Sequence, residues 1–443
     1  MSKHTRPVLP FDVIGNIIDI LIDDSNTTKG LQDVKAFSLT CQSSLPFCRK
    51  HIFSSIHIKT GMSFYKTDLQ LLRDIDEFGQ FLLESPGIAR YIRQLKICIL
   101  DSWEPEFRYA FAYFPRELTR LQSLQIYYPY SAVGWDQIPL SMQSLLLNIM
   151  HLPTLSHLHM ARIEHFPISN LINCTDIKHL SVDSLCITGE HDQAVYSLLQ
   201  KPMHLQTLDL KLTDPRRSLD LLAAKCSDGR PFLNFTGLKK ISILVNFLRS
   251  WSVVPIQEIF RHTRQLEDIH IEGMRYYMLY VPFIWLVSSL FPFFFSIAID
   301  HNFKAIEFAK AVSSSLQTLS RVHLSLGIGR LSRQDPLAGL CDELAEIVGN
   351  NKLESLEIEI NMEASEDGST GDEWGRLEKV LLKPGWPVLK HVSLDIFLWT
   401  FTQGLNNLSS VGVALKGLPQ TQFAGLTSDK NLAFRFSVQT KLV

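Results

Sequence analysis

A short spacing of apolar residues recurs along most of the chain. Apolar side chains occupy the first, fourth and sixth positions of each copy, and the central residues of successive copies lie 22 to 36 residues apart. The last two fall on one face of a strand, and the first precedes it. The copies are Ile92, Leu95, Ile97; Leu121, Leu124, Ile126; Leu155, Leu158, Met160; Ile177, Leu180, Val182; Leu205, Leu208, Leu210; Leu238, Ile241, Ile243; Leu266, Ile269, Ile271; Phe294, Ile297, Ile299; Leu319, Val322, Leu324; Leu353, Leu356, Ile358; and Leu389, Val392, Leu394.

This period is typical of a solenoid in which each repeat consists of a strand and a return. A return is the helical or irregular segment that leads the chain back to the start of the next strand. Stacked copies predict a parallel sheet whose apolar side chains share one core, and therefore an α/β fold. Helical returns are predicted at 191–200, 219–225 and 342–348, and another should begin near Asp372 and Glu373 and run to Leu382.

The residue between the last two apolar positions points to the opposite face of the predicted sheet. Ten of the eleven such residues are polar or charged, as an exposed face requires. We interpret the row as a candidate target-binding face, since repeat proteins bind partners on extended surfaces of this kind; the alternative is simply a wetted sheet face. The ten are Lys96, Gln125, His159, Ser181, Asp209, Ser242, His270, His323, Glu357 and Ser393, and Ala298 is the exception.

The N-terminal stretch 9–24 predicts a helix with an unusually wide apolar surface. At about 100° per residue, its apolar side chains cover an arc of roughly 220°, about twice what one flank of a small core needs. We assign Val13, Ile14, Ile17, Ile18 and Leu21 to the module's own core. The side chains at the edges of this arc exceed what the small core needs, and we expect a partner to cover them. They are Leu9, Phe11, Ile20 and Ile22.

Two sets of residues carry family resemblances. Leu9-Pro10, Asp12, Val13-Ile14, Ile17-Ile18 and Leu21, followed by Ser38-Leu39-Thr40-Cys41, resemble an F-box, the helical module that docks on the Skp adaptor of Skp, cullin and F-box (SCF) ubiquitin ligases. The repeated spacing resembles the leucine-rich-repeat family, whose asparagine is matched by Asn246, Asn302 and Asn361. The combination resembles the divergent fungal F-box families.

The resemblances imply an intracellular, non-catalytic adaptor that engages a Skp-type adaptor, and through it a cullin, while its repeats hold a protein target. The implied parts are an F-box-like module at 1–58, a helical connector at 59–90, repeats at 91–400 and a C-terminal cap or tail at 401–443. The implied adaptor-binding residues are Leu9, Pro10, Phe11, Val13, Ile14, Ile17, Ile18, Ile20, Leu21, Leu39 and Cys41. Alternatives are a repeat scaffold with no ligase link, whose N-terminal helices only cap the repeats, and an enzyme built in irregular loops.

Composition narrows the possible partners. The formal net charge of -2 provides no basic field for nucleic acid, and we expect none to bind. Seven scattered cysteines without a CxxC pair indicate a reducing cytoplasmic or nuclear setting, and no signal peptide is expected. The uncharged stretch 276–299 is long enough for a membrane span, but Pro282 and Pro292 favour a buried helix followed by a strand.

Motifs for catalysis are missing from the sequence. It contains no glycine-rich phosphate loop, no GxSxG and no HExxH, so we expect no catalytic residues, cofactor or small-molecule substrate. His157 and His159 share one face of a predicted strand about 7 Å apart, a spacing suited to a metal, but without neighbouring Cys or carboxylate we expect a solvated pair.

Overall fold

The structure is a computed structural model of the whole chain, in which two compact units, Met1–Ile177 and Lys178–Val443, are described separately. The first unit is described over residues 10–23, 28–40, 42–59, 75–99, 114–129, 132–171, 173–174 and 176–177. The second unit is described over residues 178–183, 187–188, 201–211, 225–226, 228–245, 254–273, 307–328, 337, 339–363, 373–400 and 405–442.

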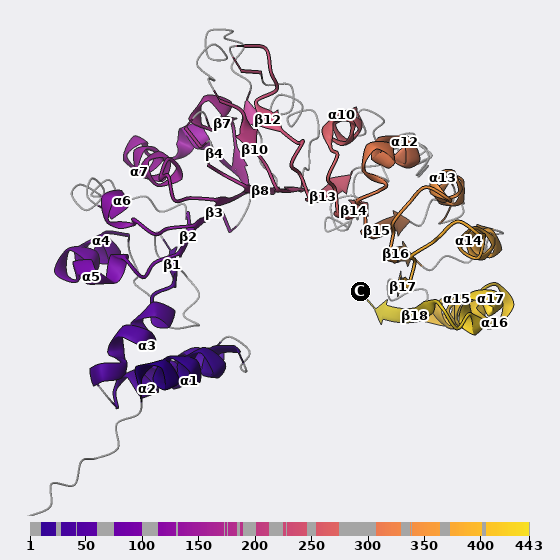
Figure 1. Cartoon of the computed structure of the whole chain (residues 1–443), viewed down its shortest axis with the longest axis horizontal. Coiled ribbons are helices and arrows are strands. Elements are labelled where there is room, and N and C mark those ends of the chain that lie inside the picture. Colours follow the sequence, from indigo (N-terminus) through magenta and orange to yellow (C-terminus); the bar gives the residue numbers. More distant parts are fainter. Residues whose placement is uncertain are drawn as a thin grey trace, which may run out of the picture. The chain divides into compact units, whose positions relative to one another are not determined.

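The first unit begins with three packed helices and continues as a parallel sheet (Figure 1). Its four sheet strands pair in sequence order, β1 with β2, β2 with β3 and β3 with β5. Helices α4 to α7 lie on one side of these strands. The bounds are α1 Phe11–Asp23, α2 Thr28–Ser38, α3 Leu45–Ile52, β1 Ser55–Lys59, α4 Ile75–Glu84, α5 Pro86–Ala89, β2 Gln94–Cys98, α6 Phe114–Glu117, β3 Ser123–Tyr127, β4 Val133–Gly134, α7 Leu140–Met150, β5 His157–Ala161, β6 Ile163–Glu164 and β7 Phe166–Pro167.

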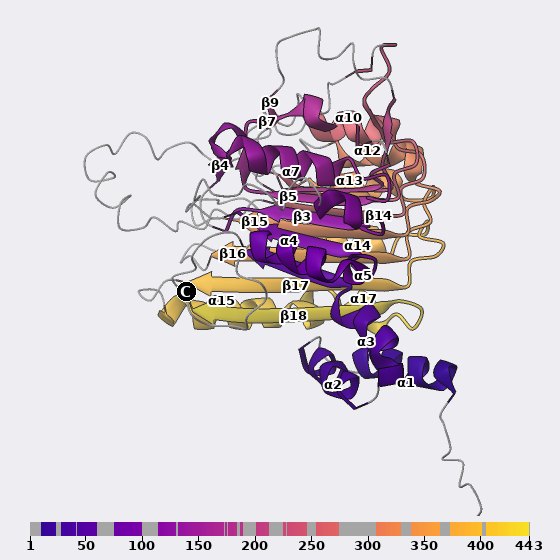
Figure 2. The same cartoon turned by 90° about the vertical axis from the view of Figure 1, so that its left-hand side faces the viewer.

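The second unit pairs eight parallel strands in sequence order, from β8 to β18 (Figure 2). Helices α10, α12, α13 and α14 contact one another in turn beside the sheet, and α15 packs on β17 and β18. The bounds are β8 His179–Asp183, β9 Ile187–Thr188, β10 Met203–His204, β11 Thr207–Lys211, β12 Leu233–Asn234, β13 Lys240–Val245, α10 Val254–His262, β14 Asp268–Gly273, α12 Phe308–Val312, β15 Arg321–Ile328, α13 Leu340–Ile347, β16 Ser355–Glu363, α14 Glu373–Leu381, β17 His391–Thr400, α15 Leu405–Lys416, α16 Leu418–Thr421, α17 Ala424–Ser428 and β18 Ala433–Leu442.

The predicted α/β fold with a parallel sheet is confirmed. Ten of the eleven copies of the apolar spacing end in a sheet strand, and their central residues pair in register, as Leu95 pairs with Leu124 and Val322 with Leu356. The apolar residues of these ten copies are buried, apart from the half-buried Leu389. The spacing therefore reports burial of one strand face and of the anchor residue before it.

A repeated backbone contact explains why the anchor and strand keep a fixed separation. In most copies the carbonyl of the residue after the anchor accepts two N–H groups of the next copy: Gln206 and Thr207 donate to the Lys178 carbonyl, at 2.7 and 3.1 Å, whereas the Lys390 carbonyl accepts the Ala433 N–H. We call this acceptor the strand-entry carbonyl. The others in the second unit are Gln206, Lys239, Glu267, Ser320 and Glu354, and those in the first unit are Ser54, Arg93 and Gln122.

The sheet begins earlier and ends later than the predicted 91–400. Strand β1 pairs with β2 from Ser55 onwards, directly after α3, and β18 pairs with β17 as far as Leu442. The copy at Phe294, Ile297 and Ile299 lies outside the described residues, as does the apolar segment 276–299. Strand β14 pairs directly with β15 in the described sheet.

Two of the predicted helical returns match described helices, α13 and α14. The return at 191–200 lies outside the described residues. Of 219–225, only Lys225 is described, and it forms an isolated antiparallel bridge with Pro231. Within the described ranges, none of the helices combines the length and the apolar character that crossing a bilayer demands.

Side chains on the returns tie neighbouring helices together. The buried Glu343 of α13 accepts the Ala309 N–H of α12 at 2.8 Å through Oε2. Glu378 of α14 accepts the N–H groups of Gly425 and Leu426, at 2.6 and 3.2 Å, at the start of α17. Each carboxylate thus satisfies amide groups that a helix start cannot pair internally.

Replacing Glu343 tests this tie. Glu343→Leu leaves the Ala309 N–H buried without its acceptor, and we expect the free energy of unfolding to fall by about 1–3 kcal/mol. Glu343→Gln keeps an acceptor oxygen and should cost less. Urea unfolding followed by circular dichroism measures both, and a Leu variant as stable as the wild type contradicts the assignment.

Candidate functional site

The N-terminal helices form a small core of their own. Ile14 and Ile18 of α1 are buried against Val34 of α2 and Cys48 of α3, with Leu21, Phe37, Phe47 and Ile52 packed around them. Desolvation by burial raises the pKa of the Cys48 thiol. Asp19 of α1 pairs with His51 Nε2 of α3 at 2.7 Å, which holds the two helices together beside this core.

One face of α1 remains outside this core. Val13, Ile17 and Ile20 are 36%, 37% and 58% exposed. They stand four and three residues apart, so they form one stripe along the helix. Covering the exposed part of each side chain is worth about 1 kcal/mol, because only part of its surface, from 36% to 58%, is still exposed.

The division of α1 differs from the predicted one. Val13 and Ile17 were assigned to the module's own core, but they line the exposed stripe with Ile20. The reason is that α2 and α3 cover only the narrow arc of Ile14, Ile18 and Leu21. A bundle of this size buries less of the helix surface than the angular estimate allowed.

The other predicted adaptor-binding residues are the half-buried Leu21, which packs against the core, and three further groups. Leu39, 88% exposed just after α2, and the exposed Pro10 before α1 are accessible. Ile14 and Ile18 face the core and are not accessible to a partner. The side chains of Leu9, Phe11 and Cys41 lie outside what the structure describes.

The predicted polar row is continuous in the second unit. The pairing register places Ser181, Asp209, Ser242, His270, His323, Glu357 and Ser393 side by side on successive strands. Arg435 of β18 extends it by one position. The Ser181 hydroxyl donates to Asp209 Oδ2 at 3.0 Å, and the row is half-buried to exposed.

Two histidines mark the middle of this row. The rings of His270 and His323 stack with centroids 4.2 Å apart and an interplanar angle of 6°, and His323 Nδ1 lies 3.5 Å from Glu357 Oε2. Burial, and then the charge of His323, lower the pKa of His270, while Glu272, Asp209 and Glu359 act in the opposite direction. Neutral His270 is therefore the favoured form.

A second row on the same face was missed. It lies two residues further along each strand and consists of Asp183, Lys211, Leu244, Glu272, Ser325, Glu359, Asp395 and Ser437. Glu359 Oε1 accepts hydrogen bonds from Ser325 Oγ and Asn361 Nδ2, and Asp395 accepts from Arg435 and Ser437. The two-residue strand period predicts this row once the strands are allowed to run past the last apolar position.

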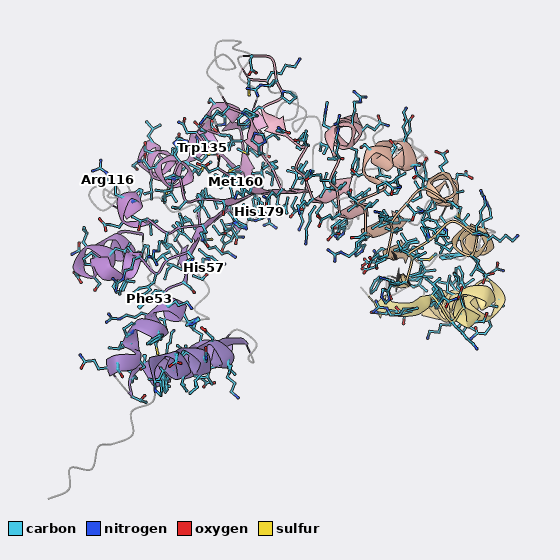
Figure 3. All side chains as sticks on the ribbon, viewed as in Figure 1. Phe53, His57, Arg116, Trp135, Met160 and His179 are labelled. Carbon is cyan, nitrogen blue, oxygen red and sulfur yellow. The ribbon has the colours of Figure 1, made fainter. Side chains whose placement is uncertain are left out.

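The first unit has its own row of His57, Lys96, Gln125 and His159. Figure 3 shows His57 on the strand side away from helices α4 and α5. Its Nε2 lies 2.8 Å from Tyr127 Oη, and Lys96 Nζ lies 4.6 Å from the centroid of the Tyr127 ring. Burial raises the pKa of Tyr127, so its hydroxyl stays protonated.

The histidines near β5 have ordinary partners. His157 is exposed and lies 2.9 Å from the Ser156 hydroxyl, and His151 Nε2 lies 3.1 Å from the Asn170 carbonyl. In the part of the chain that the structure describes, no group of three or more His, Cys, Asp or Glu residues is placed to hold a metal ion.

These surfaces are suited to binding. The helical module offers an apolar stripe, and the strand rows offer acceptors, donors and partly buried aromatic rings. No protein-family model matches the chain, and no curated protein matches it.

Substituting adjacent isoleucines of α1 separates core from surface. Ile18→Ala removes a buried side chain and should destabilise the module by about 2–5 kcal/mol. Ile17→Ala on the stripe removes a side chain that is only partly buried and should cost clearly less, about 1 kcal/mol. Hydrogen exchange of peptides from 11–52 reports local stability, and equal effects of the two substitutions would contradict this division of α1.

Stability should also depend on the protonation of His270. The unfolded chain binds this proton more readily than the folded one at pH values just below the ordinary histidine pKa of about 6.5. This contribution to the free energy of unfolding therefore falls as the pH falls through about 6.5 towards the lowered pKa, and changes no further below it. His270→Gln should lose less stability than the wild type between pH 7.5 and 5.5 in urea unfolding. Identical losses contradict the assignment.

Proposed function

We propose that this protein is the substrate-recognition adaptor of an SCF-type ubiquitin ligase. Helices α1 to α3 dock on a Skp-type adaptor and through it on a cullin, and the polar strand rows hold a protein target. The protein does no bond chemistry itself. It acts in the cytoplasm or the nucleus.

The observation that carries the proposal is the stripe of Val13, Ile17 and Ile20. An apolar surface on a helix of a small bundle is typical of a binding face, because moving it from water into contact with a partner is favourable in free energy. The stripe belongs to the residues that resemble an F-box. Pro10 and Leu39, which belong to the same motif, are exposed as well.

The repeat interpretation is supported by the sequential parallel pairing of the strands. We infer a solenoid that resembles leucine-rich repeats, in which each repeat supplies one strand and one return. Such a surface lets several strands contribute side chains to a single protein target. The rows in the second unit combine carboxylates, histidines and hydroxyls, which suits hydrogen bonding to a polar partner.

Binding of the full chain to a purified Skp adaptor, measured by calorimetry, tests the docking. We expect the double variant Ile17→Asp, Ile20→Asp to weaken binding at least tenfold, because two side chains lose their apolar contact and two charges enter the interface. Leu140→Asp on α7 is the matched control, since Leu140 is 78% exposed and lies outside the module.

The outcomes separate the alternatives. Loss of binding in the double variant, with binding retained in Leu140→Asp and exchange protection of the module unchanged, supports the proposal. A wild-type chain that does not bind the adaptor rejects the ligase function and leaves a repeat-based interaction scaffold.

A further inference from the structure

Strand β18 ends the sheet of the second unit and pairs only with β17 among the described strands. The Ala433 N–H donates to the Lys390 carbonyl of the preceding copy at 2.8 Å. Backbone groups alternate in direction along a strand, so those of Arg435, Ser437 and Gln439 also face β17. The N–H and C=O groups of Phe434, Phe436, Val438 and Thr440 therefore face away from it, on the side where the sheet has no further described strand.

The apolar side of this edge is only partly covered. Phe434, Phe436 and Val438 are half-buried, whereas their neighbours in β17 are almost completely buried. The ring of Phe423 packs against Phe434 and Phe436, with centroids 5.6 and 6.0 Å apart. Helix α15 covers the same end of the sheet and leaves Val413 71% exposed.

The features that normally keep an edge strand single are missing between Ala433 and Thr440. This stretch contains no proline, and its one charge, Arg435, is paired with Asp395 at 2.7 Å. Natural edge strands are usually protected by unpaired charges, prolines or bulges. Lys441 stands near the end of this ten-residue strand, so the eight residues before it, with their one charge neutralised and an open apolar side, are the part suited to pairing with another strand.

We propose that β18 pairs antiparallel with β18 of a second copy of this chain, with Phe436 opposite Phe436. The outward backbone groups of Phe434 then meet those of Val438 from the second copy, and the half-buried apolar side chains cover one another. Side chains directly opposite each other share one face of the sheet, so apolar meets apolar.

Charge favours this register. Arg435 of one copy lies opposite Ser437 of the other copy. Within each copy the Ser437 hydroxyl donates to Asp395, so this carboxylate lies near the arginine of the other copy. Each arginine thereby approaches a second carboxylate as well as its own. No like charges of the described side chains face each other directly, and the two-fold arrangement makes the interface closed.

Sedimentation of the full chain at increasing concentration tests the pairing. We expect a reversible dimer at micromolar concentrations. Val438→Pro removes an N–H that faces the second copy, and the two-fold symmetry removes it once from each copy. The substitution should weaken the dimer at least tenfold while the monomer stays folded. Gln439→Pro is the matched control: its N–H faces β17, so it should lower the stability of the monomer instead.

Hydrogen exchange of the unmodified protein provides a second measurement that needs no variant to fold. Amides of the peptide 433–442 should exchange more slowly as the concentration rises, because dimerisation occupies the outward groups. A wild-type chain that is monomeric at tens of micromolar, or a dimer that Val438→Pro does not weaken, overturns the proposal. A dimer without concentration-dependent protection of this peptide does so too.

Discussion

The strand-entry carbonyl is the contact on which the rest of each unit depends. One acceptor receives two consecutive N–H groups of the next copy, so the direction and the starting point of the next strand are set together. The anchor residue before each pair of donors is buried, apart from the half-buried Leu389, and this burial holds those amides in place. Strand pairing, the common apolar core and the alignment of the polar rows all follow from this starting point.

The regular part of the fold was predictable because one spacing reports both burial and register. It also matches β1, where Phe53, Ile56 and Ile58 have the same separation, although that stretch was assigned to the N-terminal module. The apolar spacing did not predict strand β18, for a different reason. Asn431 occupies its anchor position, and its apolar residues Phe434, Phe436 and Val438 simply alternate.

The N-terminal surface was only partly predictable. The helical wheel gives the width of the apolar arc of α1 but not the share that its neighbours cover, which depends on the length and angle of α2 and α3. The stripe therefore includes Val13 and Ile17 in addition to Ile20. On the strands, the first polar row followed from the spacing. The second was missed because the apolar pattern ends before the strands do.

The strand-entry carbonyl also makes the length of the segments between strands independent of strand register. In the second unit, neighbouring strands are joined by intervals as different as 28 and 53 residues, yet each strand begins at the same place relative to its neighbour. Segments between strands can therefore gain or lose residues without shifting any side chain along the rows. Related sequences can diverge in length at the returns while the order of facing residues, and with it the recognition surface, is inherited unchanged.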